Sequence, residues 1–251
     1  MDSSLISKSQ IEQFQEEGYF ILESVIPEIT LNSLRETCDT LVEEMDAQLD
    51  KEETETRNIT HRQKRYFISN QHKTTPQLRK YIFGDLMAEI CRATLGNSTY
   101  LFWEQFVVKG PEVGMKFGWH QDSGYVGYDH KPYLSCWAAI DEVSEENGTV
   151  YILPFSRAGT RKRQDHIVEE GSNDKIGYFG EDPGIPVVAP AGSIAVFSSV
   201  SFHRSSPNTS KGWRRIYLTQ YSAIPILTKD GSQLWGNAEP FLVDGDRVTT
   251  E

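Results

Sequence analysis

The chain has 251 residues, close to the upper limit for one hydrophobic core, so the first expectation is a single β-rich or α+β domain. Its composition, with 38% hydrophobic and 24% charged residues, is that of a globular protein and excludes wholesale disorder. A net charge of −11, from 36 acidic and 25 basic residues, opposes attraction to phosphate backbones. We therefore expect no nucleic acid among its partners.

The opening segment, MDSSLISKSQIEQF, has neither the basic start nor the apolar core of a signal peptide. No apolar run approaches the length of a membrane span. These observations predict a cytoplasmic protein, monomeric or homodimeric, without a membrane partner. Cys38, Cys91 and Cys136 are odd in number and widely spaced, and each lies in an apolar or amphipathic stretch. They are expected to be buried free thiols rather than disulfides or a zinc site.

Three helices are predicted in the first part of the chain. Ser7 and Gln10 form a capping-box pattern ahead of a short helix that ends at Gly18, and an extended segment follows. After Pro27, apolar residues recur at steps of three and four as far as residue 49, which indicates a long amphipathic helix. A third helical pattern covers residues 76–95.

From residue 100 onward the sequence changes to short runs of β-forming residues separated by Gly, Pro, Asn and Asp. Without helices between them, such runs predict an antiparallel barrel or jelly roll rather than a doubly wound sheet. The expected fold is mainly β with flanking helices, in one domain over residues 1–251. Within it we expect a helical buttress (1–99), a barrel core (100–225) and a C-terminal tail packed on or near the barrel (226–251). The predicted strands cover 100–108, 133–140, 149–153, 185–188, 193–197 and 215–222.

His120 and Asp122 are the first candidates for chemistry. They lie two residues apart on an expected strand end, and alternate side chains of an extended backbone point the same way. His203 follows the apolar strand near residue 197 and offers a third ligand. Two imidazoles and one carboxylate form the facial triad that suits Fe(II), although a His-x-Asp pair by itself is commonly a surface hydrogen-bonded pair. The other histidines lie in polar segments and are interpreted as solvated: His61, His72, His130 and His166.

Arg214 lies eleven residues after His203 and opens another strand. Its planar guanidinium grips a carboxylate with two hydrogen bonds, as a dicarboxylate co-substrate requires at its far end. Ser205 offers a hydroxyl donor to the same carboxylate. Taken singly, Arg214 is equally consistent with an ion pair at the barrel rim, and Ser205 with a turn.

Three groups of residues together resemble the phytanoyl-CoA dioxygenase family. They are Trp119-His120-Gln121-Asp122, then Trp137-Ala138-Ala139-Ile140-Asp141 with the Glu146-Asn147-Gly148-Thr149 and Ile152-Leu153-Pro154 segments, and His203-Arg204-Ser205-Ser206-Pro207-Asn208 ending in Arg214. The stretch from Phe14 to Val25 resembles the opening helix and first strand of that family. The likeness thus spans most of the chain.

The resemblance implies a double-stranded β-helix of the jelly-roll, cupin-like type, with Fe(II) held by His120, Asp122 and His203 and with O2 and 2-oxoglutarate as co-substrates. It further implies that the distal carboxylate of 2-oxoglutarate meets Arg214 and Ser205. Two more residues match positions beside the co-substrate in some relatives, namely Trp137 and Gln105. Aromatic residues of barrels are more often core than cofactor wall.

The implied reaction is oxidative decarboxylation to succinate and CO2, coupled to hydroxylation of an aliphatic C–H in a small molecule, in secondary or amino-acid metabolism. Asp122 disfavours a halogenase, because related halogenases lack this carboxylate. Desaturation, epimerisation and ring formation remain alternatives, as does a non-catalytic metal-binding module, and a zinc hydrolase is weaker still. One departure from the family pattern follows Leu153-Pro154, where the chain has Phe155-Ser156-Arg157 in place of the glycine-serine-histidine of many relatives.

Candidate substrate residues come from two sources. Aromatic residues flank the His-x-Asp segment and are expected pocket walls: Phe117, Tyr125 and Tyr128. Two basic clusters, around Arg65 and around Arg157, offer guanidinium groups to an anionic substrate, although such clusters more often lie in solvent. Nothing in the sequence identifies a coenzyme A site.

Overall fold

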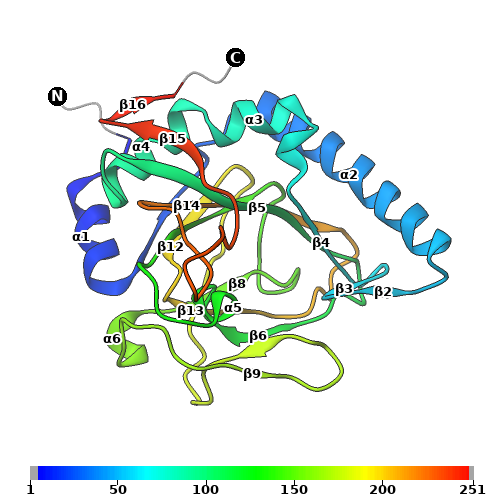
Figure 1. Cartoon of the computed structure of the whole chain (residues 1–251). Helices are drawn as coiled ribbons and strands as arrows, with labels where there is room; N and C mark the ends of the chain where they lie inside the picture. Colours follow the sequence, from blue (N-terminus) through cyan, green and yellow to red (C-terminus); the bar gives the residue numbers. More distant parts are fainter. Residues whose placement is uncertain (1–4, 249–251) are drawn as a thin grey trace.

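The structure, a computed structural model, describes residues 5–248 and contains two antiparallel sheets that face each other in a jelly roll (Figure 1). The larger sheet has ten strands, with β15 and β16 beside the path β1-β12-β7-β14-β5-β4-β3-β2. The smaller has four, in the order β11-β8-β13-β6. A mainly β jelly roll with flanking helices was the predicted fold, and it is confirmed.

The larger sheet is built of β1 (Tyr19–Leu22), β2 (Thr56–Arg57), β3 (Thr60–His61), β4 (Arg65–Ser69), β5 (Thr99–Lys109), β7 (Leu134–Ala139), β12 (Ile194–Ser198), β14 (Arg214–Ser222), β15 (Glu239–Val243) and β16 (Asp246–Arg247). The smaller contains β6 (Phe117–His120), β8 (Val150–Leu153), β11 (Ile185–Pro186) and β13 (Phe202–Ser205). A separate hairpin pairs β9 (Ile167–Val168) with β10 (Lys175–Ile176). Each strand predicted between residues 100 and 222 corresponds to one of these strands within a few residues.

The helices are α1 (Lys8–Glu17), α2 (Glu28–Lys51), η1 (Gln71–Lys73), α3 (Pro76–Ile82), α4 (Asp85–Thr94), α5 (Ser123–Val126) and α6 (Phe155–Ala158). The capping box before α1 is present, because the Ser7 hydroxyl accepts from the Gln10 backbone while the Gln10 side chain accepts from the Ser7 backbone. The single helix predicted over 76–95 was wrong. It is broken at Gly84, where a Cβ would stand 2.7 Å from the carbonyl oxygen of Lys80. Among residues 5–248, no helix is long and apolar enough to cross a membrane.

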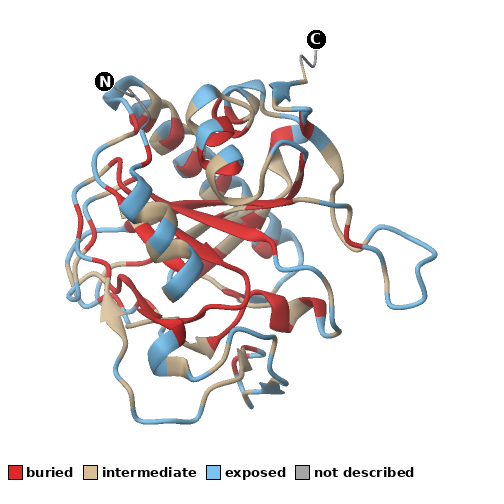
Figure 2. Ribbon diagram, turned by 90° about the vertical axis from the view of Figure 1, so that its left-hand side faces the viewer, coloured by how far each residue is buried: buried red, intermediate tan, exposed pale blue. Residues whose placement is uncertain are grey.

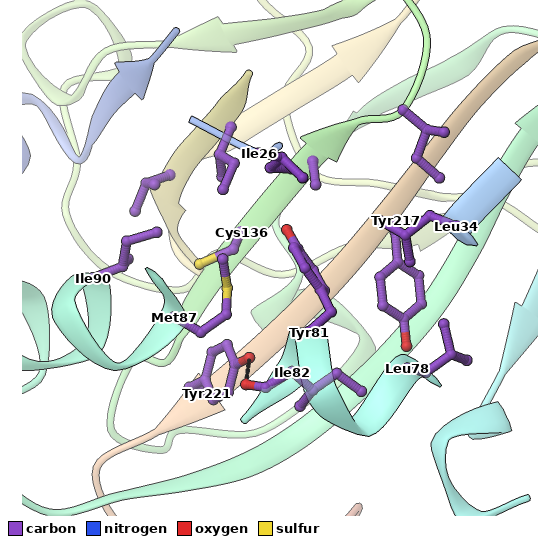
Figure 3. Close-up of a cluster of buried hydrophobic side chains, with 14 of the residues drawn as sticks. Ile26, Leu34, Leu78, Tyr81, Ile82, Met87, Ile90, Cys136, Tyr217 and Tyr221 are labelled. Atoms are coloured by element: carbon purple, nitrogen blue, oxygen red, sulfur yellow. Dashed lines mark hydrogen bonds between the residues drawn. The ribbon is translucent and has the colours of Figure 1, made fainter. Parts of the chain in front are cut away.

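Helices α2, α3 and α4 cover the outer face of the larger sheet and create the main core (Figure 1). Figure 3 shows this contact, with Tyr81 from α3 and Met87 from α4 lying against Cys136, Tyr217 and neighbouring sheet residues. The inner strands are almost entirely buried, whereas the outer helix faces are exposed (Figure 2). The three cysteines are buried and unpaired, as expected.

A second core fills part of the space between the sheets. It joins Trp137, Ile216 and Leu218 of the larger sheet to Val150 and Ile152 of the smaller one. The predicted division into buttress, core and tail stays a prediction, and residues 1–4 and 249–251 of it lie outside the described residues. Strands β1 and β4, from the first 99 residues, pair within the larger sheet, and β15 from the C-terminal segment pairs with β5.

Candidate metal and co-substrate site

His120, Asp122 and His203 converge at the inner face of the smaller sheet. His120 ends β6 and His203 lies in β13, where they are direct partners in the antiparallel register, with ring centroids 4.1 Å apart. Asp122 follows two residues after His120, at the start of α5. One ligand atom from each residue lies within 4.8 Å of the others, so the three side chains are placed to share one cation.

Local hydrogen bonds orient each of the three. Nδ1 of His120 lies 2.8 Å from the Gly118 carbonyl oxygen, and Nδ1 of His203 lies 3.1 Å from that of Ser201. A carbonyl is only an acceptor, so both Nδ1 atoms carry the proton and both Nε2 lone pairs are free for a metal. Oδ1 of Asp122 lies 3.4 Å from Nε2 of His203 and 3.8 Å from Nε2 of His120.

The electrostatics favour a metal-binding protonation state. Burial, together with the neighbouring His203 ring, holds the pKa of His120 well below its usual range, so the imidazole is neutral near pH 7. Burial alone would raise the pKa of Asp122. His203, His120 and a hydrogen bond from Ser135 outweigh it and lower that pKa to about 2, so the carboxylate is ionised. Neutral imidazoles and a charged carboxylate are what a divalent cation requires.

A cavity of about 560 Å³ opens from these residues, between the sheets. The four residues expected beside the co-substrate also line it: Arg214, Ser205, Trp137 and Gln105. The structure therefore brings together all seven residues assigned by the sequence to the metal and co-substrate. They come from five strands and one loop, spread over residues 105–214.

Arg214 is buried at one end of this cavity, and within residues 5–248 no carboxylate lies within ion-pair distance of its guanidinium. Only 1% of the residue is exposed, and its buried Nε has no hydrogen-bond partner. The guanidinium carbon lies 5.6 Å from the centre of the Trp137 ring. Burial lowers the pKa of Arg214 to about 9, which still leaves it charged at neutral pH. A buried guanidinium in this state fits the carboxylate of a bound ligand.

Gln105 and Ser205 present polar groups to the same cavity. Oε1 of Gln105 accepts from the Ser69 hydroxyl at 3.2 Å and from the Trp103 indole at 3.3 Å. This leaves the Gln105 amide nitrogen to donate to a ligand. The Ser205 hydroxyl accepts from the Lys109 ammonium at 2.7 Å, so its own proton is available to an anion.

The candidate substrate residues divide into two sets. Phe117 and Tyr125 line the cavity, and their rings stand edge-on to His120 with centroid distances of 4.3 and 5.9 Å. Arg65 also lines it, but its guanidinium is engaged by Asp174 at 2.7 and 2.8 Å, so it is not free to hold a substrate anion. Tyr128 lies outside the cavity and donates to the Leu227 carbonyl. Arg157 also lies outside it, in an exposed ion pair with Asp182, so a substrate role for these two residues stays a prediction.

The other histidines are less solvated than the sequence suggested. His72 is 1% exposed, with Nδ1 3.0 Å from the buried carboxylate of Glu104. His166 is half-buried, and its Nε2 accepts from the backbone N–H of Gln121 at 2.9 Å. This bond holds the peptide group that joins His120 to Gln121, next to Asp122. The polar residues next to these histidines in the sequence do not reveal such contacts, because the hydrogen-bond partners come from distant segments of the chain.

Sequence analysis missed three further polar residues of the cavity region. Gln220 and Ser135 both donate to Oδ2 of Asp122, at 2.9 and 2.5 Å, and leave Oδ1 for the metal. Lys109 lies beside Ser205. The alternation of side chains along a strand could have indicated two of them. Gln220 is on the same face of β14 as Arg214, and Lys109 is on the same face of β5 as Gln105.

Comparison with known proteins identifies the family of the chain. Residues 14–216 match the family model described as phytanoyl-CoA dioxygenase. The chain is 27% identical over 211 residues to a probable alpha-ketoglutarate-dependent hypophosphite dioxygenase of Stutzerimonas stutzeri, covering 79% of this chain and 69% of the relative. It is 21% identical over 231 residues to the human peroxisomal phytanoyl-CoA dioxygenase, covering 86% and 68%.

Solved structures show the same fold. EctD from S. alaskensis, with 2-oxoglutarate and 5-hydroxyectoine, superimposes with a TM-score of 0.73 at 18% identity, over 99% of this chain and 90% of that one. The carbocyclase SnoK from nogalamycin biosynthesis has a TM-score of 0.70 at 20% identity, over 98% and 94%.

A jelly roll with two imidazoles, a carboxylate and a buried arginine around one cavity has the architecture of an Fe(II)- and 2-oxoglutarate-dependent oxygenase. The chain belongs to the phytanoyl-CoA dioxygenase family of these enzymes, because the family model covers most of its length. The resemblance inferred from the sequence motifs is thereby confirmed, together with the enzyme class and its cofactors.

Proposed function

We propose that this enzyme hydroxylates an aliphatic C–H of a small organic molecule, with conversion of 2-oxoglutarate to succinate and CO2. His120, Asp122 and His203 hold Fe(II) in this proposal. The observation that carries it is the convergence of these three ligands in one cavity with an arginine that has no ion-pair partner among the described residues. Three ligands on one side of the metal leave positions open for the co-substrate and for O2.

The co-substrate is proposed to extend from the metal toward Arg214. Its keto-acid end would bind the iron held by His120, Asp122 and His203, and the amide of Gln105, which lines the cavity, could donate to that end. Its distal carboxylate meets the guanidinium of Arg214 and the hydroxyl of Ser205. Trp137 lies under that guanidinium and keeps it in place, since a cation stacks favourably on an indole face.

The bound iron supplies the activation of O2 that the protein's side chains lack. The protein positions the substrate and excludes water from the reacting atoms. Phe117 and Tyr125 form an aromatic wall beside His120, which suits the apolar part of a substrate.

Other outcomes of the same chemistry are the second candidate. Structures with this fold include the carbocyclase SnoK and the epimerase SnoN, so ring formation and epimerisation are supported by comparison. A non-catalytic metal-binding module is disfavoured, because such a module has no use for a buried carboxylate clamp beside its metal. The mass of the product distinguishes hydroxylation (a gain of one oxygen) from desaturation (a loss of two hydrogens) and from epimerisation (no change).

The first test measures the metal and co-substrate together. Anaerobic addition of Fe(II) and 2-oxoglutarate is expected to give the weak visible charge-transfer absorption of the chelate, and admission of O2 is expected to give succinate. His120→Ala and Asp122→Ala are expected to abolish both signals with little change in far-ultraviolet circular dichroism. His61→Ala, at a half-buried histidine outside the site, is the matched control. Full succinate formation by either ligand variant would remove the metal assignment.

The second test concerns the carboxylate clamp. Arg214→Met is expected to raise the KM for 2-oxoglutarate by about 10- to 100-fold, since hydrogen bonds between charged groups contribute about 1.5–3 kcal/mol. Arg215→Met is the control in the next position of β14. Its side chain points outward to Asp141 and Asp39, so it should alter stability rather than the KM. An unchanged KM in Arg214→Met would show that another residue holds the carboxylate.

A further inference from the structure

The register of β14 shows that the cavity extends in two directions from the metal ligands. Gln220, near the end of β14, donates to Oδ2 of Asp122, so the ligands lie level with this part of the strand. Arg214 is six residues away at the other end, which in an extended strand is about 20 Å. The proposed function places the co-substrate on the Arg214 side. The part of the cavity beyond Gln220 is therefore free for the substrate.

A β-bulge turns two consecutive aromatic residues of β5 toward this part of the cavity. Trp103 is the register partner of Gln220, whereas the next partner pair along the strands joins Tyr221 to Leu101. Phe102 is thus an extra residue. Side chains of a regular strand alternate between its two faces, and a bulge interrupts this alternation. As a result, both Phe102 and Trp103 line the cavity.

The C-terminal loop (residues 226–235) brings in a further tryptophan from outside the barrel core. A bridge between Leu227 and Leu234 closes this loop, and the Trp235 N–H donates to the Ile226 carbonyl at 2.9 Å. In Figure 1 the loop is drawn in orange-red between β14 and β15 and descends toward α5. There the hydroxyl of Tyr128 donates to the Leu227 carbonyl. The loop thus connects the segment after the metal ligands to β5.

The base of the C-terminal loop is pressed against the bulge. A Cβ on Gly236 would stand 2.9 Å from the Phe102 carbonyl oxygen, so a larger residue would push the loop away. The Asn237 N–H donates to the same carbonyl at 2.9 Å. Trp235 consequently stacks on Phe102, with ring centroids 5.6 Å apart, and lies 6.2 Å from the ring of Trp103. Trp235 also lines the cavity.

Phe102, Trp103 and Trp235 together form an aromatic wall beyond the metal ligands. Their rings contact one another, so they offer a continuous apolar surface rather than a cage around a ligand. The family model matches residues 14–216, and Trp235 lies beyond that match. A residue outside the common part of the family is suited to set the choice of substrate.

The charges around the cavity disfavour a cationic substrate. Among the lining residues in the described part of the chain, Asp122 is the only acidic one, and it is a metal ligand. Five basic residues line the same cavity: Arg57, Arg65, Lys109, Arg204 and Arg214. A cleft whose charges are mainly of one sign repels ligands of that sign.

We propose that the aromatic wall binds an uncharged ring of the substrate, aromatic or alicyclic, and that Trp235 is a specificity-determining residue. This inference rests on the proposed function, which fixes the positions of the metal and the co-substrate. A ring gains from burial of its apolar area and from contact with aromatic faces. Trp103 lies level with Gln220, so a ring against this wall has its aliphatic carbons beside the metal ligands.

The test uses indane, an uncharged hydrocarbon with an aromatic ring and aliphatic carbons. Anaerobic calorimetry measures its binding to the Co(II)-loaded protein saturated with 2-oxoglutarate. Trp235→Ala is expected to weaken indane binding by about tenfold, the size expected for loss of one aromatic contact. Its affinity for 2-oxoglutarate should stay within twofold of the wild type. Indane affinity within twofold of the wild type in Trp235→Ala would overturn the inference.

Two variants separate binding from packing. Trp235→Phe keeps an aromatic face and is expected to retain most of the affinity for indane. Leu234→Ala, at the exposed neighbour of Trp235 outside the cavity, is expected to change neither affinity. If Trp235→Ala and Trp235→Phe both lose indane and 2-oxoglutarate to the same extent, with a fall in Tm, Trp235 has a packing role and the inference is refuted.

A charged analogue tests the substrate class. 2-Aminoindane has the same ring system and is cationic at neutral pH. It is expected to bind at least tenfold more weakly than indane, because it meets the positive charges of the cavity. Equal affinities would refute the assignment of an uncharged ring.

The visible absorption of the Fe(II) and 2-oxoglutarate chelate distinguishes this inference from the proposed function. Indane bound beside the metal is expected to shift that absorption in the wild type. If the absorption is present but does not respond to bound indane, the ring lies away from the metal, and the inference fails while the proposed function stands. If indane binding depends on Trp235 but no such absorption forms, the aromatic wall stands and the proposed function fails.

Discussion

Gln220 is expected to control metal affinity although it is no ligand itself. Its amide donates to Oδ2 of Asp122 at 2.9 Å and to the Ser135 hydroxyl at 3.0 Å, and that hydroxyl donates to the same Oδ2 at 2.5 Å. The two donors hold the Asp122 carboxylate with Oδ1 toward the imidazoles. Gln220→Met keeps the size of the side chain and removes both of its hydrogen bonds.

The expected loss follows from the charge of the acceptor. A hydrogen bond to an ionised group contributes about 1.5–3 kcal/mol, and 1.4 kcal/mol corresponds to a factor of ten in affinity. Gln220→Met should therefore weaken Fe(II) or Co(II) binding by about 10- to 100-fold, in line with the usual effect of residues that orient metal ligands. Ser135→Ala should have an effect of similar size. The double variant should lose less than the sum, because the two side chains also bond to each other.

The assay is an anaerobic competition for Co(II) between the protein and a chromophoric chelator. Thr219→Val provides the control, since Thr219 is the neighbour of Gln220 on β14 and its hydroxyl points to Met87 on the helical side. It should leave metal affinity unchanged. If Gln220→Met binds Co(II) within twofold of the wild type and remains folded, the orientation of Asp122 does not depend on these hydrogen bonds and the reasoning is refuted.

Two further predictions concern the buried charges. Asp174→Asn leaves the Arg65 guanidinium buried without its carboxylate, so the free energy of unfolding should fall by about 3–5 kcal/mol in urea denaturation. Asp182→Asn, at the exposed partner of Arg157, should cost less than about 1 kcal/mol, and equal losses would show that burial does not matter. The second prediction concerns pH. Because burial lowers the pKa of Arg214 to about 9, its positive charge is lost as the pH rises through that value, and the affinity for 2-oxoglutarate should then fall. Arg214→Met should show a flatter profile, and parallel profiles would contradict the assignment.

The sequence predicted most of the fold because local patterns are strong here. Runs of β-forming residues separated by Gly, Pro, Asn and Asp predicted the barrel. Apolar residues at steps of three and four predicted α2. The break at Gly84 was missed. A single glycine inside a helical apolar pattern does not show that one helix ends and another begins there; this depends on the backbone contacts around it. The hairpins formed by β2, β3 and β4 were missed because their residues are largely polar.

The site shows the same limit at the level of side chains. His120, Asp122, His203 and Arg214 were predicted because their types and spacing follow the chemistry of a metal and a carboxylate. The supporting residues Gln220 and Ser135 were not predicted, because their hydrogen bonds to Asp122 join strands that are far apart in the sequence. Arg157 shows the converse case: a cationic run in the sequence suggested an anion site, whereas in the structure the residue forms an exposed ion pair with Asp182.

The two halves of the cavity belong to different sheets. His120 and His203 lie on the smaller sheet, whereas Arg214, Lys109 and Trp137 lie on the larger one. In the proposed arrangement, the co-substrate would bind the metal at one end and the guanidinium at the other, and would therefore link the two sheets. Binding of the co-substrate should therefore make the two sheets more rigid relative to each other. Small changes in the packing between the sheets, even far from the metal, should alter the affinity for the co-substrate.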